Sequence, residues 1–282
     1  MSSDQPGRTD GPTNYKPAGA ARTFDNSLDL NLIGLRTLYL KEVRRFFKVF
    51  TQTILAPVVT TCVFLAIFAL ALGRSDRMIG ELAFLTFLAP GLITMAIVQN
   101  AFANTSSSIG IAKVQGNIVD YLMPPLSPGE LLFGVVMGGV TRGVVVGVAV
   151  LVTMLFVVDL SMPQPLIALY AVLMASFILA VLGFVTALWA EKFDQMAAIT
   201  NFVITPLSFL SGTFYSIHDL PEPFHMIALF NPFFYMIDLT RYGMTGHADG
   251  VIWVGMAVLA LVAAGLWLFA IRLVQLGYKL KA

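Results

Sequence analysis

The sequence predicts an all-α integral membrane protein with six transmembrane helices, an N-terminal amphipathic interfacial helix and an extracytoplasmic re-entrant helical hairpin. Three observations lead to this prediction. Hydrophobic residues make up 57% of the 282 residues and charged residues only 12%, which is about half of their share in soluble domains. Long uncharged stretches recur along the chain, and lysine and arginine fall mostly on one side of the membrane that these stretches define.

The N-terminal segment differs from the rest in composition. Residues 1–27 are polar, rich in glycine, proline, serine and threonine, and lack the apolar stretch of a secretory signal peptide. We expect a disordered cytoplasmic tail in 1–27 and one transmembrane domain in 28–282.

An amphipathic helix is expected ahead of the first span. At about 100° per residue, the segment 35–50 has one broad apolar face. Such a helix lies along the membrane surface, either as a simple anchor that sets topology or with its basic face toward anionic lipid or a cytosolic partner. That basic face consists of Lys41, Arg44, Arg45 and Lys48. Glu42 lies near the edge of the apolar face, where Arg45 can pair with it.

The spans follow from length and charge, because a helix needs about 20 apolar residues to cross the hydrocarbon core. The predicted spans are 51–72, 82–104, 131–158, 165–190, 195–211 and 251–271. The third contains Arg142, and the fifth is the shortest.

The distribution of positive charge sets the orientation, since excess lysine and arginine stay cytoplasmic. With the N-terminus inside, the outer segments contain only three positive residues, Arg74, Arg77 and Arg241. The inner segments contain ten, which are Arg36, Lys41, Arg44, Arg45, Lys48, Lys113, Lys192, Arg272, Lys279 and Lys281. The chain is therefore predicted to be a multi-pass protein of the inner (plasma) membrane with both termini cytoplasmic.

A short helix is expected in the second inner segment, KVQGNIVDYLM, where Pro124 and Pro125 stop it. Its apolar side chains would remain at the cytoplasmic surface, and an exposed apolar helix of this kind marks the docking site of a partner. These side chains are Ile118, Val119, Tyr121, Leu122 and Met123.

Arg142 lies about 12 residues into the third span, roughly 18 Å deep at 1.5 Å per residue. A charge at this depth is costly without partners. It is either structural, paired with carbonyl groups or with Gln99, Asn100 or Asn104, or part of a gate or translocation path. Glycines four residues apart surround it and indicate close helix packing, within the chain or between two copies. They are Gly134, Gly138, Gly139, Gly143 and Gly147.

No catalytic or cofactor site is predicted. His218, Asp219, Glu222 and His225 are close in sequence, but Pro221 and Pro223 interrupt any helix that could present them together to a metal. The chain contains no Gly-Lys pair and hence no phosphate-binding loop. The net charge of +1 gives no electrostatic footprint for nucleic acid.

Five sequence blocks in a fixed order on this frame resemble the permease subunits of bacterial type-2 ABC transporters, over residues 35–281. The blocks are KEVRRFF (41–47), FLAPGLITMAIVQNAFAN (87–104), VDYLMPPLSPGELLFG (119–134), VITPLSFLSGTFYSIHDLP (203–221) and NPFFYMIDLTRYGMTG (231–246). The resemblance implies an exporter of drugs, polysaccharides or lipid-linked glycans. It also implies a second permease copy and a separate cytoplasmic ATP-binding subunit that holds ATP and magnesium.

The resemblance also implies roles for the cytoplasmic segments. The helix 35–50 becomes a connecting helix, and ATP-driven closure of the partner pushes on a coupling helix that re-angles the second and third spans. Asp120 is the acid placed to meet a basic residue of that partner. The coupling residues are then Ile118, Val119, Asp120, Tyr121, Leu122, Pro124 and Pro125.

A re-entrant hairpin is expected in 212–246. Its charge-free run 223–237 is too short to cross the membrane and return, and it divides into two short helices at Asn231–Pro232. Asp238 and Arg241, three residues apart, can pair as an outer brace. The resemblance implies that the hairpin caps the outer end of the pore, with Gly212, Phe214 and Tyr215 at its mouth.

Scattered polar residues in the second and fifth spans are expected to line the translocation path and suit an amphipathic, lipid-like substrate. They are Gln99, Asn100, Asn104, Asn201, Thr205 and Ser208. Two alternatives stay open. A secondary transporter would need ionisable residues in several spans, and a membrane-embedded enzyme would need a catalytic cluster near one membrane face.

Overall fold

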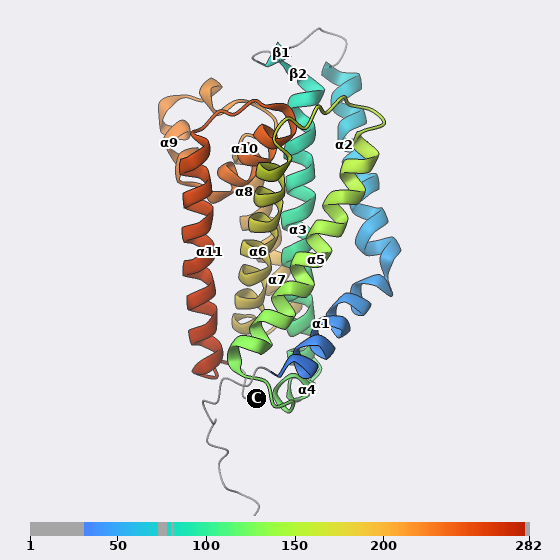
Figure 1. The fold of residues 1–282 in the computed structure, drawn as a ribbon, viewed down its shortest axis with the longest axis vertical. Helices are drawn as coiled ribbons and strands as arrows, with labels where there is room; N and C mark the ends of the chain where they lie inside the picture. The colour runs from blue at the N-terminus through green and yellow to red at the C-terminus, as the bar shows by residue number, and fades with distance from the viewer. Residues whose placement is uncertain (1–30, 73–77, 80–81, 280–282) are drawn as a thin grey trace, which may run out of the picture. The chain divides into compact units, whose positions relative to one another are not determined.

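The computed structural model describes residues 31–72, 78–79 and 82–279. The predicted tail 1–27 lies outside the described residues, as do Arg74, Arg77 and Lys281 of the charge count. In the described part, long helices run side by side, with shorter elements at both of their ends (Figure 1). The long helices are α2 (Ala56–Leu72), α3 (Phe84–Val114), α5 (Pro128–Met154), α6 (Pro165–Trp189) and α11 (Ile252–Gln275).

The predicted all-helical membrane fold is confirmed in its main features. Five helices of the described residues are long and apolar enough to cross a membrane. They correspond to the first four predicted spans and the last one. The predicted span 195–211 is built instead from α7 (Phe193–Ile199), the π-helical turn η2 (Thr200–Ile204) and α8 (Thr205–Leu210), and it is not among the five.

Helix α3 differs most from its prediction, because it ends at Val114 rather than at residue 104. The polar run after residue 104, which the prediction placed outside the span, continues the helix. It stays helical since its side chains face the protein, and Asn104, Thr105, Ser106 and Ser108 are all buried. This helix contacts α2, α5, α6 and α10 and forms the centre of the bundle.

The predicted surface helix is α1 (Leu32–Phe47), which begins at an N-cap where Asn31 accepts a hydrogen bond from the Gly34 amide. Leu38, Glu42 and Phe46 form its buried face, one turn apart. A π-helical turn, η1 (Thr51–Leu55), then leads directly into α2. Residues 51–72 are therefore continuous helix, as predicted.

The coupling segment is α4 (Val119–Leu122), a single helical turn at the same end of the bundle as α1 (Figure 1). It is followed by Ser127, which caps α5 in a reciprocal pair with Glu130. Glu130 also accepts a hydrogen bond of 2.6 Å from the Asn31 amide, so the beginnings of α1 and α5 are joined.

The opposite end of the bundle carries the segments predicted as a hairpin. A two-stranded ribbon, β1 (Met78–Ile79) and β2 (Leu82–Ala83), precedes α3 there. A turn, η3 (Ile217–Asp219), leads to α9 (Glu222–Phe230) and then to α10 (Pro232–Thr245). The predicted break at Asn231–Pro232 is confirmed, and Asn231 caps α10 by accepting from the Phe233 amide.

Glycines let the helices approach closely within the chain. A Cβ on Gly138 would lie 2.5 Å from Glu42 Cβ, and one on Gly139 would lie 3.1 Å from the Ala101 carbonyl oxygen. Gly134 likewise faces Leu38 of α1, and Gly143 and Gly147 face Ile97 of α3. The intrachain interpretation of this glycine pattern is therefore confirmed.

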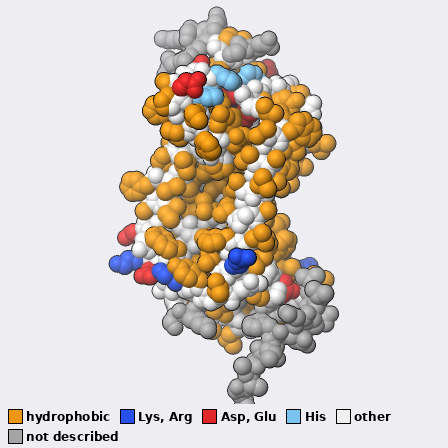
Figure 2. Space-filling view, turned by 90° about the vertical axis from the view of Figure 1, so that its left-hand side faces the viewer, with side chains coloured by type: hydrophobic (Ala, Val, Ile, Leu, Met, Phe, Trp, Pro, Cys, Tyr) orange, Lys and Arg blue, Asp and Glu red, His pale blue; other side chains and the backbone are white. Residues whose placement is uncertain are grey.

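Hydrophobic side chains cover the middle of the face shown in Figure 2, and charged side chains gather toward its two ends. The histidines lie together at one end, beside acidic residues. This distribution is the one expected of a protein whose middle is surrounded by lipid.

Candidate functional site

A buried carboxylate joins three elements at the α4 end of the bundle. Glu42 of α1 is fully buried. Its Oε1 accepts hydrogen bonds from the Tyr121 hydroxyl of α4 at 2.9 Å and from the Ser108 hydroxyl of α3 at 2.7 Å. The two hydroxyl oxygens lie 3.0 Å apart. We call this cluster, together with Arg45, the Glu42 hub.

Arg45 completes the hub and ties it to the backbone of α3. Its guanidinium forms a 3.3 Å salt bridge with Glu42 Oε2, so the predicted pair is confirmed. The same group donates to the carbonyl oxygen of Asn104 at 2.6 Å and to the Ser107 hydroxyl at 3.1 Å. Charge-assisted hydrogen bonds of this kind compensate for the burial of a carboxylate.

Tyr121 is held as a hydrogen-bond donor by its surroundings. Burial and the nearby Glu42 carboxylate raise the pKa of the Tyr121 hydroxyl to about 12. Lys41 Nζ lies 3.7 Å from the centre of its ring, within the range of a cation–π contact. Tyr121 therefore holds α4 against α1 through its hydroxyl and its ring.

This arrangement corrects part of the coupling-helix prediction. Ile118 and Tyr121 are buried rather than exposed, because other helices of the same chain cover them. Val119, Leu122 and Met123 remain exposed, and so do Asp120, Pro124 and Pro125. A partner could contact α4 only through these exposed residues.

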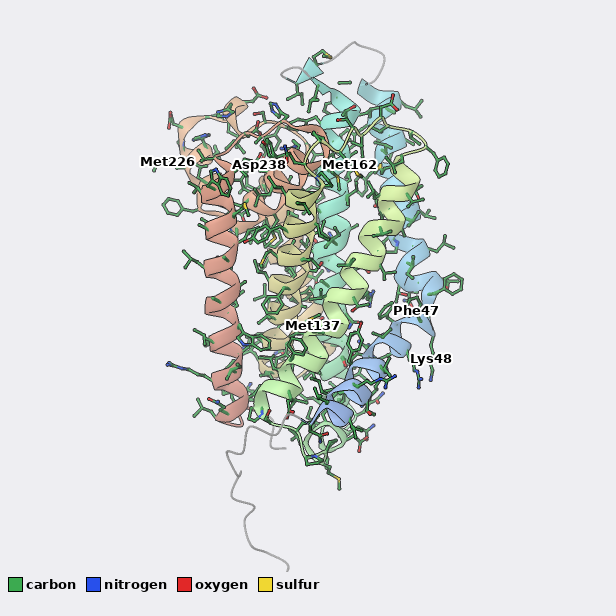
Figure 3. The ribbon with its side chains drawn as sticks, viewed as in Figure 1. Phe47, Lys48, Met137, Met162, Met226 and Asp238 are labelled. Carbon is green, nitrogen blue, oxygen red and sulfur yellow. The ribbon has the colours of Figure 1, made fainter. Side chains whose placement is uncertain are left out.

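The predicted basic face of α1 is also divided. Lys41, Arg44 and Lys48 are exposed, and Figure 3 places Lys48 on the outer side of α1. Arg45 turns inward to the hub instead. Glu42, expected at the edge of the apolar face, lies at the centre of the buried one, because Gly138 of α5 leaves room for its side chain.

A stripe of residues that are not buried runs along α3 at four-residue intervals. Met95, Gln99, Ala103 and Ser107 are partly exposed, and Ile111 is exposed. Of the predicted path residues, Gln99 and Thr205 are partly exposed and Asn201 is exposed. Asn100, Asn104 and Ser208 are buried.

Arg142 reaches α3, where its Nη2 donates to Asn100 Oδ1 at 2.9 Å. Pairing with one of the three predicted amides is thus confirmed. Asn100 also lines a pocket of about 260 Å³ between α2 and α3.

A second buried cluster lies at the opposite end of the bundle, and we call it the outer latch. Arg241 of α10 is fully buried, and its guanidinium lies 3.7 Å above the Phe87 ring of α3 and 3.8 Å from Asp249 Oδ2. It also donates to the carbonyl oxygens of Phe87 and Gly212. One side chain thereby joins α3, α10 and the two loops that contain Gly212 and Asp249.

The predicted brace named the wrong partner for Arg241. The salt bridge of Arg241 is with Asp249, eight residues along the chain. Asp238 instead accepts hydrogen bonds from the amides of Asp249 at 2.8 Å and Gly250 at 3.0 Å. It therefore shapes the loop that supplies Asp249, and Figure 3 places it inside the bundle at the end away from Lys48.

The three residues predicted at the mouth of the pore lie beside this latch. Gly212 adopts a positive φ of 74°, which suits glycine at a sharp turn after α8. Phe214 packs against Phe209 and Phe68, with ring centres 5.3 and 5.1 Å away. The Tyr215 hydroxyl donates to the Leu210 carbonyl oxygen.

A third contact between distant helices, at the C-terminus of α6, was not predicted from the sequence. Lys113, counted above among the charges of the inner segments, belongs to α3 and donates to the carbonyl oxygens of Ala187, Leu188 and Ala190 at 2.6–3.0 Å. These are carbonyl groups that a helix C-terminus leaves without partners. No periodic pattern could indicate this contact, since it joins residues that are 74–77 positions apart.

No single helix presents the histidine cluster, as the prolines predict, but the rings of His218 and His225 still lie close together, with centres 5.9 Å apart. His218 lies in η3 and His225 in α9, which begins after Pro221. Within the described ranges, no group of three histidine, cysteine, aspartate or glutamate side chains could hold a metal ion.

Known proteins are similar to this chain over most of its length. The model of the family described as ABC-2 type transporter matches residues 34–245. The chain is 31% identical over 255 residues to the inner membrane transport permease YadH of Escherichia coli (strain K12), covering 90% of this chain and 100% of that protein. It is 29% identical over 180 residues to nodulation protein J of Rhizobium leguminosarum bv. trifolii, covering 62% of this chain and 68% of that protein.

Proposed function

The chain belongs to the ABC-2 type transporter family, and on this premise we propose that it is the permease subunit of an ATP-driven exporter. As a family member it is a multi-pass inner-membrane transport permease, a non-enzymatic membrane component. In the proposed assembly, two copies of the chain form the pore. A separate cytoplasmic ATP-binding subunit supplies the energy, and an amphipathic, lipid-like, glycan or drug substrate moves outward.

The observation that carries this proposal is the Glu42 hub. A partner that moves the exposed face of α4 would pull on Tyr121, which is bonded to Glu42 of α1 and lies beside Ser108 of α3. Because Glu42 and Arg45 are bonded to the same stretch of α3, α1 and α4 move together with the cytoplasmic end of that helix. This is the mechanical link that a permease without its own ATPase requires.

The surface of the spans supports a second copy and a polar path. Asn201 of η2 is exposed at the level of the spans, and Gln99 of α3 is partly exposed. Polar side chains in this zone are costly against lipid tails. We therefore place them at a path between two copies, where a substrate with polar and apolar parts finds both kinds of contact.

The proposed direction follows from the distribution of positive charge. If the α4 end is cytoplasmic, as the lysine and arginine residues indicate, the outer latch lies at the exit. Opening of the path then requires movement of α10 relative to α3 and of the loop at Gly212.

The test is capture of an ATP-binding subunit by the full chain in mild detergent. Val119→Asp, on the exposed face of α4, is expected to abolish capture, because it puts a charge into an apolar contact. Val251→Asp is the matched control, since Val251 is similarly exposed but precedes α11 at the opposite end of the bundle. Equal capture by both variants would contradict the assignment of α4 as the docking site.

A further inference from the structure

Arg142 carries a partly buried charge that the described residues do not neutralise. Its guanidinium has one hydrogen bond, to Asn100 Oδ1, and none of the salt bridges in the described ranges includes it. The only carboxylate of the Glu42 hub is already paired with Arg45.

Two hydrogen-bond donors in this region also lack acceptors. Arg142 Nε and Asn104 Nδ2 are both buried without a hydrogen-bond partner in the part of the chain that the structure describes. A buried donor without an acceptor costs about 1–3 kcal/mol, and a buried unpaired charge costs more. An acceptor group with a negative charge would complement this region.

A pocket with mixed polarity lies next to this charge. It has a volume of about 260 Å³ and lies between η1 and α2 on one side and α3 on the other. Asn100, which receives the Arg142 hydrogen bond, forms part of its wall. Its apolar lining includes Phe64, Leu92 and Met95.

The polar wall of the pocket offers further donors. Gln52 and Gln99 line it, and neither side-chain amide makes a hydrogen bond to the residues that the structure describes. Thr60 lies in the same wall, as does Thr61, whose hydroxyl already donates to the Pro57 carbonyl oxygen. Amides and hydroxyls together with a nearby arginine are the groups that bind phosphate oxygens.

We propose that this pocket binds the phosphate headgroup of an anionic amphiphile. Arg142 supplies the charge from behind Asn100, Gln52 and Gln99 donate to the headgroup oxygens, and the acyl chain lies along Phe64, Leu92 and Met95. The pocket volume of about 260 Å³ is large enough for a headgroup. The inference rests on the proposed function in so far as it names the class of substrate.

Binding can be measured with the permease alone, so its outcome does not depend on ATP or on export. The full chain is placed in nanodiscs of phosphatidylcholine and titrated with fluorescently tagged phosphatidic acid or with diacylglycerol that carries the same tag. We expect saturable binding of the phosphatidic acid at an affinity about tenfold higher than that of the uncharged analogue. Arg142→Gln should reduce this affinity about tenfold, as expected for the loss of a charge-assisted contact.

Arg272→Gln is the matched control. Arg272 is an exposed arginine of α11 and does not line the pocket. Its loss should change the affinity less than twofold. Equal losses in Arg142→Gln and Arg272→Gln would show general attraction to the positive charge of the protein and would overturn the proposal.

Two further arms keep the test decisive if Arg142→Gln does not elute as a folded species. Arg142→Lys should retain binding, since the charge remains, and Gln99→Leu should weaken it several-fold.

Millimolar inorganic phosphate should not displace the tagged lipid, whereas displacement would show that the pocket takes free phosphate. Equal affinity for the two tagged lipids would also overturn the proposal. A chain that binds the phosphatidic acid but fails to export would contradict the proposed function alone.

Discussion

At the scale of single residues, two buried charges define the two ends of the molecule. Glu42 is surrounded by the donors Ser108, Tyr121 and Arg45. Arg241 has one carboxylate, two carbonyl groups and an aromatic face around it. Each charge is bonded to elements that are distant in sequence, so each acts as a point where separate helices are fastened together.

Asp249→Asn tests the outer latch. Removing one partner of a buried ion pair leaves the other charge uncompensated, and we expect a loss of roughly 3 kcal/mol of stability. The measurement is unfolding in detergent, followed by the fluorescence of Trp189, Trp253 and Trp267. Asp219→Asn, an exposed acid in η3, is the control and should behave as wild type. If the two variants unfold alike, Asp249 is not the counter-charge of Arg241.

Residue types were easier to predict than their partners. The sequence indicates that Glu42 and Arg45 can pair, because both lie on one helix. It does not indicate Ser108 or Tyr121, which are separated from Glu42 by 66 and 79 positions. Asp249 was missed for a related reason, since helical spacing favoured Asp238 and the loop that brings Asp249 back has no periodic signal.

At the scale of elements, hydropathy found five long helices, but it found neither the division of 195–211 into short elements nor the end of α3. The residues after 104 are polar, and hydropathy cannot distinguish polar groups that face water from those that face Glu42 and Arg45. The π-helical turns η1 and η2 were missed for another reason, because they have no pattern distinct from that of an α-helix. Both occur in the segments predicted as the first and fifth spans, and such turns often occur at functional sites.

Gly183→Ala tests the close contact between α6 and α3. A Cβ at Gly183 would lie 2.3 Å from Thr105 Oγ1 and 2.5 Å from the Phe102 carbonyl oxygen, so the two helices must separate. We expect a loss of about 1–3 kcal/mol in detergent unfolding. Gly265→Ala in α11 is the control, because no heavy atom beyond the neighbouring residues and the backbone of its own helix lies within 4 Å of the added Cβ. It should be neutral or slightly stabilising, and a similar loss in both variants would contradict tight packing at Gly183.

At the scale of the whole described bundle, α3 connects the two fastened ends. The Glu42 hub holds it at Asn104–Ser108, and the outer latch holds it at Phe87. The 17 positions from Phe87 to Asn104 span about 25 Å of helix. A displacement of α4 can therefore reach the outer latch through one continuous helix.

At this scale the helical membrane fold was predictable from the sequence. The connection of the two ends through α3 was not. Hydropathy indicated five of the long helices, and motif order indicated the family. The orientation derived from the charges stays a prediction. The role of α3 depends on contacts at both of its ends, which become visible only when α1, α4 and α10 are packed around it. The second copy stays a prediction, carried by exposed polar residues such as Asn201.

The most direct measurement follows the outer latch while ATP acts at the other end. In a Cys62→Ser background, Phe214→Cys is labelled from outside with a membrane-impermeant maleimide, in vesicles that contain the permease and its ATP-binding subunit. ATP should raise the labelling rate in this protein and in a Tyr278→Phe control, which changes an exposed tyrosine after α11. Tyr121→Phe, which removes only the hydroxyl that donates to Glu42, should retain the partner and lose the ATP-dependent rise. A full rise in Tyr121→Phe would contradict the connection from α4 through α3.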